Sequence, residues 1–211
     1  MADDFFDIRL LGFADFEASR RFLCTLDNEI WLSRWSKGGT EITVDRPVEL
    51  TTGGKMRAEL EKSSRITVVS AHGYWGHGGC GFCGKDENTT LLLADKIENI
   101  GAQSMLLIDA CRTPILAERI SNSAAPRRLI VGLERAPGEE KVTQETAGSD
   151  SVTVIAAVIR ELCYPKNKAL YRPAVERAIK RVNAQVEAYN RGASVEEKRP
   201  KIYVYPEPDP L

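Results

Sequence analysis

The chain has 211 residues, 43% of them hydrophobic and 28% charged, a composition typical of a globular protein and not of a disordered one. Its length predicts a single domain over 1–211 with a core large enough to fold without disulfides or metals. Lys and Arg total 29 and Asp and Glu total 30, which leaves a formal net charge of -1. No basic excess is available to neutralise phosphates, so nucleic acid is not an expected direct partner.

The first residues, M-A-D-D-F-F-D, lack the basic and apolar regions of a signal peptide. No apolar stretch is long enough to cross a bilayer, so we expect a cytoplasmic protein without a membrane partner. An odd number of cysteines in that compartment does not indicate a disulfide framework and favours thiol chemistry or metal binding. The cysteines and histidines of the chain are Cys24, Cys80, Cys83, Cys111, Cys163, His72 and His77.

The first part of the chain mixes strand and helix patterns. In chain order we expect a strand over 7–12, a helix over 18–26, strands over 30–34 and 41–44 around a turn at 37–39, and a helix over 55–62.

The two clearest strands lie in the middle of the chain. The run R-I-T-V-V-S over 65–70 leads into Ala71-His72-Gly73, and the run S-M-L-L-I-D over 104–109 leads into Ala110-Cys111. Uninterrupted apolar strands are typical of a parallel sheet covered on both faces. Between them we expect a glycine-rich loop over 73–84 and a helix around 92–100, which together predict a right-handed crossover.

The remaining elements complete an α/β pattern with a mostly parallel sheet. They are a helix that starts at Thr113-Pro114, a strand over 128–133, a helix over 152–162 capped by Ser149-Asp150-Ser151, a helix over 172–189 and a last strand over 201–205. The β-branched residues of 152–162 leave a strand open as the alternative for that segment.

The ends of the two central strands carry the chemistry that nucleophilic thiol catalysis requires. Sites in open α/β sheets form at the carboxyl ends of the strands, where His72 and Cys111 both follow. A helix beginning just after Cys111 favours its thiolate, and His72 is placed to take the thiol proton or to protonate a leaving amine. The N–H groups of Gly73 and Cys111 are the candidates for an oxyanion hole.

The motifs V-V-S-A-H-G over 68–73 and L-L-I-D-A-C-R-T over 106–113 resemble the caspase-like cysteine peptidases, which include caspases, metacaspases and bacterial CHAT domains. The resemblance extends more weakly over 7–205. It implies a caspase-like three-layer α/β/α sandwich with a mostly parallel central sheet. It further implies a cysteine endopeptidase that forms a thioester through a His-Cys dyad, with no cofactor and with protein or peptide substrates.

Four residues of this sequence match functional positions of that family. His72 matches the catalytic histidine and Cys111 the nucleophile. Asp109 matches the aspartate with which metacaspases bind a basic P1 side chain, and Ser70 matches a serine of the same pocket, so the resemblance implies a preference for Arg or Lys. Arg112 stands where metacaspases carry a histidine, which makes CHAT domains the preferred subgroup. That subgroup implies a regulatory protein partner on a separate chain and a role in bacterial defence or stress responses.

Three alternatives remain open at this point. His77, Cys80 and Cys83 form H-x-x-C-x-x-C, a spacing compatible with zinc in a binding module. The same segment can instead be a mobile loop at the rim of the cleft, with Trp75 and Phe82 covering substrate or core. The chain can also be a binding or scaffold module that keeps the fold without catalysis.

Overall fold

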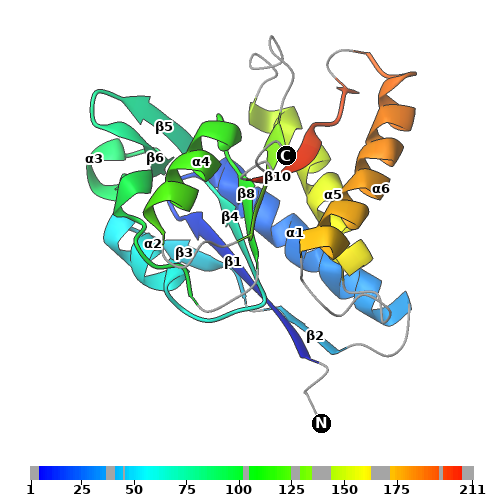
Figure 1. Cartoon of the computed structure of the whole chain (residues 1–211), viewed down its shortest axis with the longest axis horizontal. Helices are drawn as coiled ribbons and strands as arrows, with labels where there is room; N and C mark the ends of the chain where they lie inside the picture. Colours follow the sequence, from blue (N-terminus) through cyan, green and yellow to red (C-terminus); the bar gives the residue numbers. More distant parts are fainter. Residues whose placement is uncertain are drawn as a thin grey trace.

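The computed structural model describes residues 5–36, 41–44, 46–101, 105–124, 129–134, 144–162, 172–194 and 197–205. A central sheet in the order β10-β9-β8-β4-β1-β2, with β3 also on β1, runs through the molecule (Figure 1). Every neighbouring pair in it is parallel except β10 with β9, which confirms the mostly parallel sheet. Its strands are β1 (Phe5–Phe13), β2 (Glu41–Val44), β3 (Val48–Leu50), β4 (Ile66–Ser70), β8 (Met105–Asp109), β9 (Leu129–Glu134) and β10 (Lys201–Tyr205).

Helices cover both faces of this sheet (Figure 1). The helices are α1 (Glu17–Ser36), α5 (Gln144–Leu162) and α6 (Arg172–Asn190) on one side and α2 (Gly53–Leu60) and α4 (Thr113–Ser123) on the other. None of the helices in the described ranges has the length and apolar character needed to cross a bilayer.

Successive residues of the central strands point to opposite helix layers, because side chains alternate along a strand. Val68 belongs to the core under α1, α5 and α6, whereas Val69 belongs to the core under α2 and α4. Leu107 and Leu106 divide in the same way. Both layers need apolar partners, which explains why these strands read as continuous hydrophobic runs.

The glycine-rich segment expected to be a loop over 73–84 is instead a β-hairpin. Strands β5 (His72–Gly76) and β6 (Gly79–Cys83) pair antiparallel, and β7 (Leu92–Leu93) adds to β6. Glycine is required here for close backbone approach: a Cβ on Gly81 would lie 2.2 Å from the carbonyl oxygen of Leu92. The prediction of a loop was wrong because composition alone does not distinguish a turn glycine from a packed one.

Two other expected elements are corrected. Residues 30–34 form no strand but continue α1, whose buried face includes Phe22, Leu26 and Ile30. The range 92–100 holds β7 and the short 3-10 helix η1 (Ala94–Lys96) in place of a helix, after the four-residue α3 (Glu87–Thr90).

Helix α5 begins at Gln144, so 149–151 lie inside it and do not cap it. The alternative strand over 152–162 is excluded by the same helix. The predicted turn at 37–39, Cys163 and the residues at 104 and 128 lie outside the described residues.

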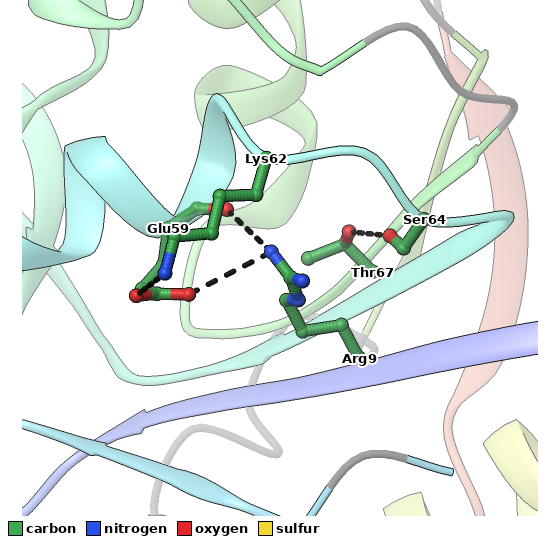
Figure 2. Close-up of polar contacts among 5 residues, drawn as sticks. All are labelled: Arg9, Glu59, Lys62, Ser64 and Thr67. Atoms are coloured by element: carbon green, nitrogen blue, oxygen red, sulfur yellow. Dashed lines mark hydrogen bonds and ion pairs between the residues drawn. The ribbon is translucent and has the colours of Figure 1, made fainter. Parts of the chain in front are cut away.

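A polar cluster fixes the end of α2 to the sheet (Figure 2). The Arg9 Nη1 atom lies 3.6 Å from Glu59 Oε2 and donates to the Glu59 carbonyl oxygen at 3.4 Å, while Lys62 pairs with the same carboxylate. The side chains of Arg9 and Glu59 are 15% and 17% exposed. Beside them, the hydroxyls of Ser64 and Thr67 are hydrogen-bonded at 2.7 Å. The Arg9–Glu59 contacts join α2 to β1, and the Ser64–Thr67 bond joins the segment after α2 to β4, the strand that leads to His72.

Two asparagines of α6 bind the backbone of the last segment. Asn183 Nδ2 donates to the Ile202 carbonyl at 2.8 Å, and its Oδ1 accepts from the Ile202 N–H at 3.0 Å. Asn190 makes the same pair of bonds with Arg199, both at 2.9 Å. Since β10 pairs with β9 through its other side, the Asn183 amide occupies the outer edge of the sheet at Ile202.

Candidate active site

The two central strands bring His72 and Cys111 to the same edge of the sheet. Strands β4 and β8 are parallel neighbours with Ser70 opposite Asp109, and the Ala71 N–H donates to the Asp109 carbonyl at 3.1 Å. His72 and Cys111 each follow two residues after this matched pair. The chain therefore leaves both strands at the same level, with the histidine and the cysteine on adjacent strand ends.

Gly73 packs directly on the backbone of Cys111. A Cβ at Gly73 would lie 2.0 Å from the Cys111 carbonyl oxygen, 2.8 Å from its carbonyl carbon and 3.1 Å from its nitrogen. Any side chain at this position would force the two segments apart. The missing Cβ of Gly73 thus sets the close approach between the backbone after His72 and the backbone of Cys111.

The His72 side chain is half-buried and held by a ring contact. Its imidazole stacks on Phe16, with 3.9 Å between ring centroids and an interplanar angle of 25°. Burial lowers the pKa of His72 below its ordinary value, and the negative charges of Asp15 and Glu87 partly oppose that shift. The imidazole is accordingly neutral near pH 7 and has a nitrogen able to accept a proton.

Cys111 is exposed and lies at the start of α4. Arg112, the N-cap of this helix, has φ 59° and ψ 34°, a left-handed backbone conformation that residues other than glycine rarely adopt. The predicted helix start is confirmed, with Pro114 in the first turn and the Thr113 hydroxyl donating to the Ala110 carbonyl at 2.7 Å. Helix α4 therefore begins two residues after Cys111.

Ser70 and Asp109 are joined to each other at the strand ends. Ser70 Oγ donates to Asp109 Oδ2 at 2.9 Å, and the Ser70 side chain is buried whereas Asp109 is partly exposed. Ser19 of α1 donates to the Ser70 carbonyl at 2.5 Å and anchors the end of β4. The Asp109 carboxylate is therefore held in a fixed orientation one residue before Ala110 and two before Cys111.

A cavity of about 390 Å³ opens beside His72. It is lined by His72, Gly73, Tyr74, Trp75, Cys83, Gly84, Lys85, Glu87 and Arg112. Cys111, Ser70 and Asp109 are not among its lining residues. Two lining residues are nonetheless neighbours of Cys111: Gly73 packs on its backbone, and Arg112 follows it in the chain. The cavity is therefore on the imidazole side of the candidate dyad.

Sequence reasoning missed Tyr74, Cys83, Lys85 and Glu87 as residues of this cavity. They come from the hairpin and from the segment after it, which the composition had indicated to be a loop. Trp75 was placed at the rim of the cleft and is 51% exposed there, whereas Phe82 is fully buried in the core. The sequence signal for these residues is the pair of charged side chains just after Cys83, Lys85 and Glu87. A predicted hairpin over 72–83 would have placed them near His72.

Cys83 is the cysteine that lines the cavity, yet its chemistry does not suit a nucleophile. It is 2% exposed, and it lies opposite His72 in the β5–β6 register. Burial, together with the charges of Glu87 and Asp15, raises its pKa to about 11. The Cys83 sulfur therefore remains a neutral thiol at physiological pH, whereas the exposed Cys111 is accessible to reagents and substrates.

The spacing H-x-x-C-x-x-C does not assemble a metal site in the described part of the chain. His77 is exposed at the end of the hairpin, Cys80 is buried in the core under α4, and Cys83 faces the cavity. Across the described ranges, no three His, Cys, Asp or Glu side chains are grouped so that they could hold a metal ion.

Comparison with protein-family models and with curated proteins finds no match to this chain.

Proposed function

We propose that the chain is a cysteine endopeptidase of the caspase-like type, with Cys111 as nucleophile and His72 as the group that moves the proton. The observation that carries the proposal is the packing of Gly73 on the Cys111 backbone at the ends of two adjacent parallel strands. An accessible thiol, a neutral imidazole and two neighbouring backbone N–H groups are the parts that acyl transfer requires.

The reaction follows from these parts. His72 takes the proton of the Cys111 thiol, and the thiolate attacks the carbonyl carbon of the scissile peptide bond. The oxyanion of the tetrahedral intermediate accepts hydrogen bonds from the N–H groups of Gly73 and Cys111, each donor contributing about 10²–10³-fold in rate in sites of this kind. The C–N bond then breaks as the leaving amine takes the proton from His72. Water, activated by the same imidazole, hydrolyses the thioester and frees the Cys111 sulfur.

Asp109 and Ser70 supply a preference for substrates with Arg or Lys at P1. The Asp109 carboxylate, oriented by the Ser70 hydroxyl, supplies the negative charge that pairs with a guanidinium or ammonium group. The same charge repels acidic P1 side chains. The caspase-like sandwich, the CHAT subgroup, a regulatory partner on a separate chain and a role in bacterial defence remain what the two motifs imply.

A peptide-library profile of the wild type beside a Cys111→Ala variant tests the activity. Cys24→Ala is the matched control, because Cys24 is also an exposed free cysteine but lies on α1. We expect cleavage by the wild type and by Cys24→Ala, none by Cys111→Ala, and an unchanged melting temperature in all three. Equal cleavage by Cys111→Ala would exclude this mechanism.

A non-catalytic binding module is the second candidate, because the cavity beside His72 is lined without Cys111 and carries the exposed ring of Trp75. A peptidyl ketone that reacts with catalytic thiols separates the two. Rapid labelling of Cys111 that is lost in His72→Ala supports the peptidase. Labelling at the same slow rate as Cys24 supports the binding module.

A further inference from the structure

The cavity lies on the side of the dyad from which the leaving group departs. It is lined by His72 and Gly73 but not by Cys111. The histidine of such a dyad protonates the nitrogen of the scissile bond, so the substrate residues that follow this nitrogen lie nearest the imidazole. A cavity bounded by His72 therefore faces the part of the peptide on the C-terminal side of the cleaved bond.

The charged groups of the cavity favour an anion. Arg112 and Lys85 contribute two cations, and Glu87 contributes one carboxylate. In the described part of the chain neither cation is engaged in an ion pair, and both side chains are exposed. Among the lining side chains the two cations outnumber the one carboxylate, and this excess of positive charge beside a substrate path favours negative charge on the substrate.

Arg112 is presented to the cavity by its unusual backbone and by an aromatic ring. Arg112 has a left-handed backbone conformation at the start of α4, and its side chain makes no capping hydrogen bond to that helix. The guanidinium carbon instead lies 5.4 Å from the ring centroid of Trp75, itself half-exposed on β5. A guanidinium lying over a ring keeps its in-plane N–H groups available for a carboxylate.

We infer that this cavity is the subsite for an acidic side chain, Asp or Glu, on the leaving-group side of the scissile bond, with Arg112 and Lys85 binding its carboxylate. The inference rests on the proposed peptidase function and adds a second determinant to it. Asp109 selects a basic residue before the bond, and Arg112 with Lys85 select an acidic residue after it. The preferred substrate thus changes sign of charge across the cleavage point.

Binding of a product-like peptide tests the subsite without any cleavage. The Cys111→Ala protein is titrated with Glu-Ala-Ala-amide and with Gln-Ala-Ala-amide, following the tryptophan fluorescence or the heat of binding. We expect roughly fivefold tighter binding of the Glu peptide, the effect of two exposed charge pairs, and a ratio near one after Arg112→Gln with Lys85→Gln. Lys55→Gln is the control, since Lys55 is exposed on α2 and does not line the cavity. Equal affinities for the two peptides in the parent protein would overturn the subsite.

Cleavage assays then separate the subsite from the proposed activity. Peptides that keep one basic P1 residue and carry Glu, Gln or Lys after the bond are compared in the wild type. Faster cleavage of the Glu peptide by a similar factor supports the subsite, and cleavage that depends on Cys111 but ignores this residue refutes the subsite alone. If no peptide is cleaved while the Glu peptide still binds more tightly, the peptidase proposal fails and the acidic site stands.

Discussion

Replacing Gly73 by alanine perturbs the contact on which the candidate site depends. The added methyl group would lie 2.0 Å from the Cys111 carbonyl oxygen and 2.8 Å from its carbonyl carbon, and both are backbone atoms that cannot rotate away. To reach even a tight contact of 3.0 Å, the two segments must separate by about 1 Å. Strand β5 or the start of α4 has to move, and His72 moves relative to Cys111 with it.

The expected effects follow from that displacement. Forcing one extra carbon into a packed contact costs about 1–3 kcal/mol of folding free energy. For a chain of this length each kcal/mol lowers the melting temperature by about 2–4 °C, so we expect a decrease of roughly 2–12 °C. A misplacement of about 1 Å between reacting groups lowers a reaction rate by roughly 10²-fold. We therefore expect kcat/KM to fall about 100-fold while the protein remains folded.

Thermal unfolding and peptidase kinetics measure the two effects separately. Gly78→Ala is the matched control, because Gly78 lies at the turn of the same hairpin and a Cβ there has its nearest neighbour, Leu93 Cδ1, at 4.0 Å. That variant should unfold within about 0.5 kcal/mol of the wild type and keep its rate. If Gly73→Ala unfolds at the same temperature as Gly78→Ala, the packing of Gly73 on Cys111 is refuted, whatever the activity. If it is destabilised but fully active, the contact is structural and the dyad geometry does not depend on it.

Three further predictions concern other parts of the structure. Glu87→Gln removes a charge that raises the pKa of His72, so the acid limb of the kcat/KM profile should move to lower pH, with no loss of kcat/KM at pH 8. A shift of the acid limb to higher pH would contradict the assignment of that limb to His72. With its pKa near 11 and its side chain 2% exposed, Cys83 should resist iodoacetamide at pH 7.5 until the protein unfolds, which mass spectrometry of the labelled protein detects; labelling of Cys83 as fast as the exposed Cys24 would refute its burial. Glu59→Gln breaks the partly buried pair with Arg9 and should lower the free energy of unfolding in urea by about 1–3 kcal/mol. The same change at an exposed glutamate is the control and should have no effect. An unchanged urea midpoint would show that the cluster does not anchor α2.

The central strands and the relation between His72 and Cys111 were accessible from the sequence. A strand buried on both faces is continuously apolar, so β4 and β8 can be predicted from their local sequence alone. Because parallel strands end at the same edge, the two residues that follow them are expected together. Both inferences need the local sequence and one general rule of sheet topology.

The hairpin and the cavity were not accessible, because their determinants are contacts between distant segments. Gly73 and Gly81 serve strand packing through neighbours at 111 and 92, and nothing local separates them from turn glycines. The buried stripe of α1, with Phe22, Leu26 and Ile30, packs in one core with α5, and this packing outweighs the β propensity of residues near Ile30. Lys85 and Glu87 became part of the candidate site only when the hairpin placed them beside His72.

The amide of Asn183 has a consequence for self-association. A strand at the border of a sheet exposes a row of backbone groups that another polypeptide can extend, which leads toward fibres. At Ile202 those groups are already occupied by the two bonds from Asn183, so an incoming backbone finds neither a donor nor an acceptor there. The Asn183 side chain thereby limits the extension of this sheet at Ile202, and we expect Asn183→Ala to expose these two backbone groups to pairing with another molecule.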